Sequence, residues 1–344
     1  MGQQSRIAVD NSREKIASIL NCRPTEIIFT SGGTESDNTA IKGGSQGLSQ
    51  QGNHIITSSI EHHAVLNTFY QMKDQGYDTT FIKVGSDGLV NPQDILNAMT
   101  DKTVLVSIMY VNNEVGTIQP IKEITKLVKE KADSLNTRVL VHTDAVQAPG
   151  YLSLDVEDLG VDLMSLSAHK FYGPKGVGFL YRERKTKLNS LIIGGSQEEN
   201  KRAGTENVSG IAGLGEAASL ISKNLDKRIK HLSKLEELFK IKIRELNSSI
   251  IYNGDPKNHV PGLISISFPG NRSDILLAKL DRKGIELSNG SACGSGIAKP
   301  SPVLKAMGIN DEHNLSTLRI SFGRSNTKND INQLVKEIGL IINE

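Results

Sequence analysis

The chain has 344 residues, 37% hydrophobic and 23% charged, a composition typical of a globular protein large enough for two domains. Its net charge of +2 gives no indication of a nucleic-acid partner, and no apolar stretch predicts a membrane span or a signal peptide. The two cysteines, Cys22 and Cys293, are too few for a disulfide framework, a zinc site or a cysteine-bound cluster, so we expect a reducing, cytoplasmic location.

The first two thirds of the chain alternates between predicted strands and helices. A short strand at 26–30 leads into a glycine-rich turn, and Thr34 with Asp37 has the spacing of a capping box that begins a helix. Helices are expected from His63 and over 121–132. Further short strands are expected at 54–58, 104–109, 139–142, 163–166 and 178–181. This rhythm predicts crossover connections and an α/β fold with a mostly parallel sheet covered by helices.

The pattern changes in the last third of the chain. A long charged helix is predicted over 214–246 with a break near Asn224, and its basic run at 223–230 is typical of a solvated helix surface. The later elements are a strand at 263–268 and helices at 275–283 and 331–342. We therefore expect a large domain over residues 1–226 and a smaller α+β domain over 227–344.

Polar groups follow the predicted strands of the first domain, at the sheet edge where ligands bind in such folds. Taken singly, each has an ordinary explanation as a turn, a hydrogen-bonded histidine or a helix cap. Together they should converge and supply what pyridoxal phosphate (PLP) needs: a lysine, a carboxylate for the ring nitrogen, phosphate donors and a group over the ring. The groups lie at 32–34, 61–63, 112–114, 144–147 and 167–170.

Seven stretches, in the same order over nearly the whole chain, resemble the cysteine desulfurases of the class-V aminotransferase-like enzymes. They match the branch that serves nitrogenase maturation and iron–sulfur cluster assembly. The stretches are SGGTESDN at 31–38, EHHAV at 61–65, VNNEVG at 111–116, HTDAVQ at 142–147, SAHK at 167–170, RAGT at 202–205 and GSAC at 290–293. The resemblance implies a PLP-dependent transferase of fold type I that removes sulfur from L-cysteine and releases L-alanine.

The resemblance also implies roles around the cofactor. Lys170 would carry PLP as a Schiff base and move protons, while Asp144 would pair with the pyridinium nitrogen. His62 would stack on the ring and take part in catalysis. Gln147 and Asn113 would hydrogen-bond the phenolic oxygen, and Asn113 would also contact the substrate. The phosphate would be held by Gly33, Thr34, Ser167 and His169, and by Thr205 from the neighbouring subunit of a homodimer.

Two more roles concern the substrate and its sulfur. Arg319 would clamp the substrate carboxylate, which a guanidinium fork matches; Arg324 competes for this role, and motif position favours Arg319. Cys293 lies among small residues at 288–296, a run that suits a mobile exposed loop. It would take the sulfur as a persulfide and pass it to an iron–sulfur scaffold or a tRNA-thiolation protein. Cys22 fits an ordinary packed thiol.

Two alternatives stay open. Another PLP lyase or aminotransferase of the same fold, such as a selenocysteine lyase or a kynureninase-like enzyme, would share Lys170 and Asp144 without the loop around Cys293. The chain also begins later than members of the family do, so the second alternative is an N-terminally shortened, catalytically weak partner protein. A metal enzyme is disfavoured, because His62 and His63 are adjacent and their side chains should diverge.

Overall fold

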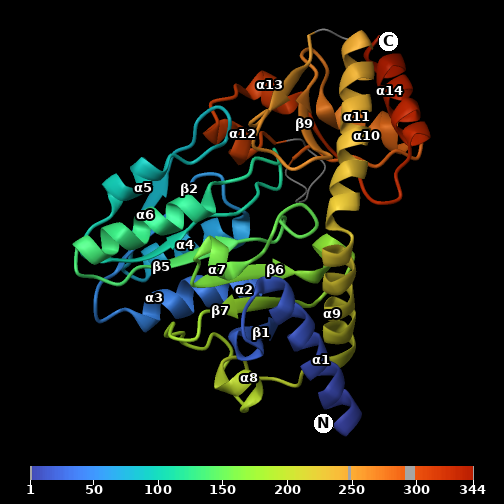
Figure 1. Ribbon diagram of the computed structural model, residues 1–344. Helices are drawn as coiled ribbons and strands as arrows, with labels where there is room; N and C mark the ends of the chain where they lie inside the picture. Colours follow the sequence, from blue (N-terminus) through green and yellow to red (C-terminus); the bar gives the residue numbers. More distant parts are fainter. Residues whose placement is uncertain (1, 247–248, 291–298, 344) are drawn as a thin grey trace. The chain divides into compact units, whose positions relative to one another are not determined.

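The computed structural model describes residues 2–246, 249–290 and 299–343. These residues form two compact units (Figure 1). The first unit takes 1–83, 90–111 and 119–225, and the second takes 84–89, 112–118 and 226–344. The break after Leu225 adjoins the boundary expected from the sequence. The sequence did not predict that residues 84–89 and 112–118 belong to the second unit. Both segments are short connections, and no change in composition marks them.

A seven-stranded sheet forms the centre of the first unit. Its order is β1-β7-β6-β5-β4-β2-β3, and neighbouring strands are parallel except in the two pairs that include β7. The strands are β1 (Ile27–Thr30), β2 (His54–Ser58), β3 (Asp78–Ile82), β4 (Thr103–Ser107), β5 (Leu140–Asp144), β6 (Leu163–Ser167) and β7 (Gly178–Arg182). β2, β4, β5 and β6 are buried along their whole length, as strands covered on both faces should be.

Helices enclose this sheet, and α1 lies along α9 (Figure 1). In α6, the buried residues Ile121, Ile124, Val128 and Ala132 recur at helical spacing, so one apolar stripe faces the core. The helices of the unit are α1 (Gln3–Leu20), α2 (Gly33–Asn38), α3 (Gly44–Gly47), α4 (His63–Asp74), α5 (Pro92–Ala98), α6 (Ile121–Ser134), α7 (Val156–Leu159), α8 (Gln197–Asn200) and α9 (Val208–Lys223).

The core of this unit lies between the sheet and its helices. Ile55 of β2 and Leu105 of β4 are fully buried, and Phe69 and Met72 of α4 belong to the same cluster. Removing a side chain of this size from water contributes about 1.5–3 kcal/mol. This packing holds the strand ends, and the polar side chains that follow them, in fixed positions.

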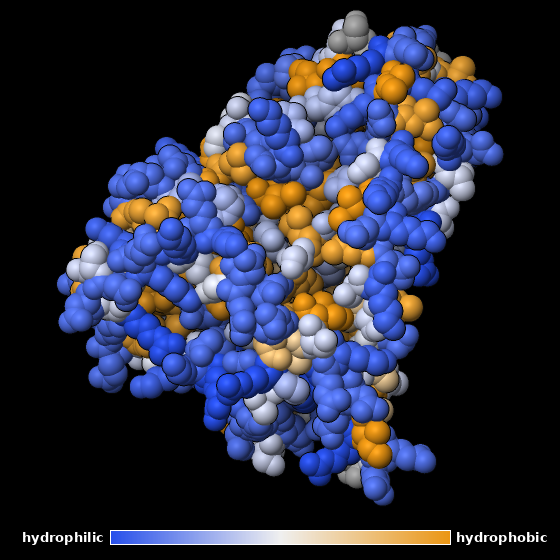
Figure 2. Space-filling model, in the orientation of Figure 1, coloured by the Kyte–Doolittle hydropathy of each residue, from blue (hydrophilic) through white to orange (hydrophobic). Residues whose placement is uncertain are grey.

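The second unit contains a three-stranded antiparallel sheet of order β10-β9-β8. Asn224 separates α9 from α10, which confirms the expected break. Lys223, Lys227 and Lys230 are exposed, in agreement with a solvated helix surface, and Figure 2 shows mostly hydrophilic side chains on the face it presents. The elements are β8 (Ile251–Asn253), β9 (Leu263–Ser267), β10 (Thr317–Ser321), α10 (Leu225–Leu246), α11 (Ser273–Asp281), α12 (Pro302–Ala306), α13 (Asp311–Leu315) and α14 (Lys328–Ile342).

The predicted capping box of Thr34 and Asp37 is wrong. The helix begins at Gly33, and Glu35 ties its first turn by accepting the backbone N–H of Ser31 at 2.8 Å. Asp37 is buried at 1% exposure instead of capping the helix.

Strand β3 was also not expected, because its threonines and aspartate lack an apolar run. Within the described ranges, no helix combines the length and apolar content that crossing a membrane requires.

Candidate functional site

The ends of two neighbouring strands bring Asp144 and Lys170 together. Asp144 is the last residue of β5, and Lys170 lies in the 3₁₀ turn Ala168–Phe171 directly after β6, the parallel neighbour of β5. Burial raises the pKa of Asp144 to about 6, whereas the Val146 amide and the Lys170 ammonium oppose that rise. The carboxyl is 5% exposed and the lysine side chain is exposed. A buried acid therefore lies within electrostatic reach of an accessible amine.

Backbone hydrogen bonds fix the position of Asp144. Its Oδ1 accepts the N–H of Val146 at 2.9 Å, and its backbone carbonyl accepts the N–H of Tyr110 at 2.9 Å. The second bond ties the end of β5 to the segment after β4. The carboxyl is thus held rigidly at the edge of the sheet, as a partner for a heterocyclic nitrogen must be.

His62 caps helix α4 through its side chain. The Nδ1 atom accepts the N–H of Ala64 at 3.1 Å, so the proton of the neutral ring resides on Nε2. Desolvation lowers the pKa of His62, and electrostatic interaction with His63 and Lys170 lowers it further. The ring is therefore a neutral N–H donor at pH 7, close to Lys170.

The glycine-rich turn before α2 lies against the loops after β5 and β6. A Cβ on Gly33 would lie 2.8 Å from Cγ2 of Val146 and 3.6 Å from Cβ of Ser167. The Ser167 hydroxyl contacts Nδ1 of His169 at 2.9 Å, and Thr34 is exposed beside them. The glycine-rich turn and the segment at the end of β6 thus bring a hydroxyl and an imidazole close to the start of α2, an arrangement that suits a phosphate.

The close approach at Gly33 predicts a specific stability effect. Gly33→Ala should force Val146 aside and lower the free energy of unfolding by about 1–3 kcal/mol, the usual cost of overpacking. Adding Val146→Ala should restore most of the loss, because it removes the methyl group that the new Cβ would meet. Chemical denaturation of the single and double variants measures both effects. Equal stability of the single variant and the parent protein would contradict the tight contact.

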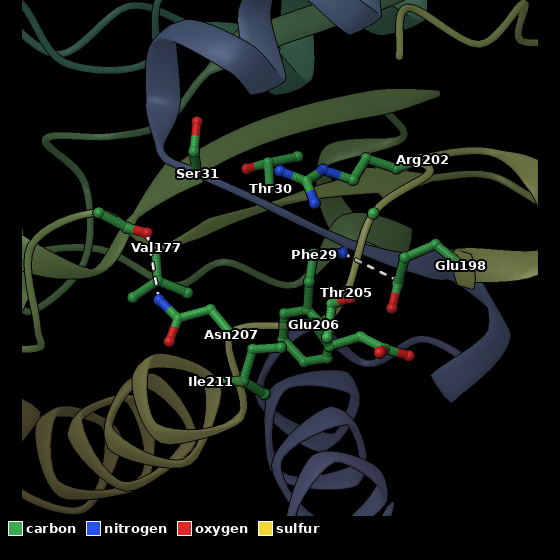
Figure 3. Close-up of a pocket in the computed structure, with 12 residues that line it drawn as sticks. Phe29, Thr30, Ser31, Val177, Glu198, Arg202, Thr205, Glu206, Asn207 and Ile211 are labelled. Carbon is green, nitrogen blue, oxygen red and sulfur yellow. Dashed lines mark hydrogen bonds between the residues drawn. The ribbon is translucent and has the colours of Figure 1, made fainter. Parts of the chain in front are cut away.

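Thr205 lies in a loop that is tied to the glycine-rich turn of the same chain. Arg202 donates to both carboxylate oxygens of Glu35 in α2, at 2.8 and 3.3 Å. Thr205 is exposed and lines a cavity of about 100 Å³ with residues of β1 such as Thr30 (Figure 3). Phe29 donates its backbone N–H to Glu198 at 3.0 Å at the rim of this cavity.

Asn113 and Arg319 belong to the second unit and contact each other there. Nη1 of Arg319 donates to the carbonyl of Asn113 at 3.0 Å and to that of Gly290 at 3.4 Å. Desolvation lowers the pKa of Arg319 below its ordinary value, and the carboxylate of Glu114 offsets part of that shift. Arg319 is half-buried, whereas its competitor Arg324 is exposed.

The remaining expected residues lie in different settings. Gln147 is half-buried in the loop after β5, and Cys293 lies outside the described residues. Cys22 is half-buried, and burial together with Glu26 raises the pKa of its thiol to about 12.

The sequence did not predict that Asp37 and Glu61 are buried beside Asp144. A carboxyl within a motif otherwise rich in small and polar residues carries no pattern that distinguishes burial from capping.

The described side chains around Asp144 fit PLP by their chemistry. An exposed amine, a buried carboxyl that meets it electrostatically, a neutral imidazole and a cluster of hydrogen-bond donors are the groups such a cofactor requires. Glycine at position 33 lets this turn approach the loop after β5 closely, because a Cβ there would press on Val146. Over the ranges that the structure covers, no three His, Cys, Asp or Glu side chains are arranged to hold a metal ion.

Comparisons with known proteins agree with this chemistry. The aminotransferase class-V family matches residues 1–334. The cysteine desulfurase IscS of Dictyoglomus turgidum is 45% identical over 341 residues, which cover 99% of this chain and 85% of that protein. Among solved structures, a NifS-like protein superposes with a TM-score of 0.92 at 35% identity, covering 99% of this chain and 88% of the other. SspA in complex with cysteine matches with a TM-score of 0.78 at 35% identity over 93% of this chain and 88% of that one.

Proposed function

The chain belongs to the cysteine desulfurases of the aminotransferase class-V family, which are PLP-dependent enzymes, and we propose how its own residues carry out that reaction. The observation that carries the proposal is that buried Asp144 and exposed Lys170 follow adjacent strands and interact electrostatically. The substrate is L-cysteine and the products are L-alanine and enzyme-bound sulfur. When bound, PLP supplies an electron sink that makes the α-proton of cysteine acidic and lets the carbon–sulfur bond break.

Side chains of the first unit would hold and orient the cofactor. Lys170 would attach it covalently, and Asp144 would meet its ring nitrogen. Gln147 would hydrogen-bond its phenolic oxygen, and the family resemblance gives Asn113 the same role. The phosphate would be held by Gly33, Thr34, Ser167 and His169. The converging donors around the Gly33 turn support this assignment.

Proton movement would fall to Lys170 and His62. Once L-cysteine is bound, the amine of Lys170 would remove its α-proton and return a proton later. His62 would lie over the ring and donate from Nε2, the atom that its cap on Ala64 leaves protonated. Arg319 would hold the substrate carboxylate, because a guanidinium group can form two coplanar hydrogen bonds to it.

Sulfur transfer would use Cys293. Its thiolate would attack the sulfur of the substrate, so that a sulfur–sulfur bond forms as the carbon–sulfur bond breaks. The carbon would then gain a proton and leave as alanine. The persulfide would pass to an iron–sulfur scaffold or a tRNA-thiolation protein. This chemistry needs thiols in a reducing compartment, so we place the protein in the cytoplasm.

The active form would be a homodimer in which Thr205 reaches the cofactor phosphate of the neighbouring subunit. Thr205 is exposed, and the Arg202–Glu35 ion pair fixes its loop. Analytical ultracentrifugation of the PLP-loaded protein tests the assembly. A monomeric protein that forms alanine at full rate would exclude this role for Thr205.

The direct test of the function is an assay of alanine from L-cysteine, with mass spectrometry for added sulfur on the peptide that contains Cys293. Protein loaded with PLP should form alanine and gain the mass of a sulfur atom on that peptide. Alanine without that mass would favour another PLP lyase, such as a selenocysteine lyase-like enzyme. A protein that takes up no PLP would favour a catalytically weak partner protein.

Two substitutions at His62 should separate its two roles. His62→Asn keeps a side chain able to accept the Ala64 amide, whereas His62→Ala removes the cap and should lower the free energy of unfolding by about 1 kcal/mol. Both remove the ring, so both should slow alanine formation by roughly 10²–10⁴-fold, the usual contribution of a positioned acid–base group. For each variant, denaturation measures the change in the free energy of unfolding, and steady-state assays on the same preparation measure the change in the rate of alanine formation. A normal rate in His62→Asn would limit the residue to capping.

A further inference from the structure

A carboxyl cluster, formed by Asp37, Glu61 and Asp144, lies buried at the end of β5. The three residues are 1%, 3% and 5% exposed. They come from α2, from the turn before α4 and from β5, so three elements separated in sequence bring three acids together. Desolvation is the largest cause that raises the pKa of Asp37 and of Glu61, and the Asp144 carboxyl raises both further.

Glu61 is held by one of its two oxygens. Its Oε1 accepts the hydroxyl of Ser58 at 2.5 Å and the backbone N–H of Met109 at 3.0 Å. The next backbone N–H, of Tyr110, donates to the Asp144 carbonyl. Within the described part of the chain, the buried Oε2 of Glu61 has no hydrogen-bond partner. An ionised carboxylate would leave charge on that oxygen uncompensated.

The carboxyl of Asp37 is also only partly hydrogen-bonded. The Ser165 hydroxyl hydrogen-bonds its side chain, but its buried Oδ1 lacks a partner among the residues the structure covers. His142 lies nearest, with Nε2 at 3.7 Å, yet its ring contacts the hydroxyls of Ser107 and Ser165 at 2.8 and 2.9 Å. Burial lowers the pKa of His142 to about 3, so this ring brings no positive charge to Asp37 at neutral pH.

The charges that act on the cluster favour one ionised member. Among the described residues, Lys170 acts on Asp144 as a positive charge. Asp37 instead meets the carboxyls of Asp144 and Glu61 and the neutral ring of His142, and Glu61 meets the carboxyl of Asp144. Three adjacent carboxylates cannot all ionise in an interior without counter-charges. We propose that Asp37 and Glu61 are positioning residues that stay protonated, so that the cluster carries its negative charge on Asp144.

The purpose of this arrangement rests on the proposed function. Asp144 would present one carboxylate to the cofactor's ring nitrogen, and two neutral acids would surround that carboxylate without adding charge. A neutral acid can also keep its hydrogen bonds to Ser58, Met109 and Ser165. The protonation of Asp37 and Glu61, however, is a property of the chain itself. It can be tested on protein without PLP.

The test is thermal unfolding of PLP-free protein between pH 6.5 and 8. Glu61 has a folded pKa of about 8, above its ordinary value of 4.5, so the folded state holds a proton that the unfolded state releases. The resulting stability is complete below pH 4.5 and is lost as pH rises toward 8. The lowered pKa values of His54, His62, His142 and His169 also affect stability in the lower part of this window, but the parent protein and each variant share them, so they cancel in the difference between the two.

Glu61→Gln and Asp37→Asn imitate the protonated acids. Each variant should therefore gain Tm relative to the parent protein as pH rises from 6.5 to 8, with about one proton fewer released on unfolding. Glu236→Gln is the contrasting control. Desolvation would raise the pKa of Glu236, but hydrogen bonds from His259, Lys240 and the Gly262 amide outweigh it and hold the pKa at about 2, so the amide variant should lose Tm across the whole window. A Glu61→Gln variant that behaves like Glu236→Gln would overturn the proposal.

An infrared spectrum of the unmodified protein keeps the proposal testable if a variant does not fold. Carbonyl absorption of protonated carboxyl groups should persist at pH 7 in PLP-free protein, and its absence would refute the proposal. Added PLP separates this inference from the proposed function. If the pH profiles agree but PLP does not bind, the proposed function fails and the inference stands; if PLP binds but the profiles are reversed, only the inference fails.

Discussion

Lys170→Ala should abolish alanine formation from L-cysteine, with a loss of at least roughly 10²–10⁴-fold from the missing acid–base group alone. Lys170 is an accessible amine beside buried Asp144, so it is the group placed to bind the PLP aldehyde. Borohydride reduction of the loaded protein, followed by peptide mass mapping, should find the cofactor mass on the Lys170 peptide. The variant should show neither that mass nor the visible absorbance of bound PLP.

Lys73→Ala is the matched control for this prediction. Lys73 is also exposed and lies in the last turn of α4, the opposite end of that helix from His62. Its removal should leave the absorbance and the rate unchanged. Cofactor mass on another lysine, with activity retained in Lys170→Ala, would refute the assignment of Lys170.

Much of the fold could be predicted from local patterns. The strand at His54–Ser58 and the helix that starts at His63 lie where the sequence placed them, because buried apolar runs and helical periodicity mark such elements clearly. Other boundaries moved slightly: the strand expected at 104–109 is Thr103–Ser107, and β5 extends to Asp144. Strand β3 escaped prediction because residues such as Thr79 and Thr80 give it little apolar content.

The first unit also brings together several residues that the sequence grouped. Asp144 and Lys170 meet because parallel neighbours end at one edge of a sheet, a rule that needs only the strand assignment. The protonation of the site could not be predicted in this way. It depends on which carboxyl oxygens find partners, and the unpartnered Oε2 of Glu61 is visible only once Ser58 and Met109 are placed in three dimensions.

The misinterpretation of Asp37 follows from the same limit. Its spacing from Thr34 is correct for a capping box, but the helix starts at Gly33 and Glu35 secures the first turn. Spacing along a helix describes which residues share a face, and it does not say whether that face meets solvent or the end of β5. Burial decided between the two interpretations, and burial is a property of the packed unit.

Cys293→Ser should stop sulfur transfer while leaving PLP attached to Lys170. A serine hydroxyl is a far weaker nucleophile toward sulfur than a thiolate, so alanine formation should fall by roughly 10³-fold or more, as loss of a covalent nucleophile does. The peptide that contains residue 293 should gain no sulfur mass. Absorbance of bound PLP should be unchanged, which separates this loss from a failure to bind the cofactor.

Cys22→Ser provides the control, since Cys22 is the other cysteine of the chain. A thiol with a pKa of about 12 is ionised in only about one molecule in 10⁴ at pH 8, whereas a thiol with the ordinary pKa of about 8.5 is ionised in about a quarter. Burial and Glu26 thus make Cys22 a poor nucleophile whatever its access to substrate. Its variant should form alanine and carry the persulfide at the normal rate. Persulfide found on Cys22, or unchanged sulfide release by Cys293→Ser, would transfer the sulfur-accepting role away from Cys293.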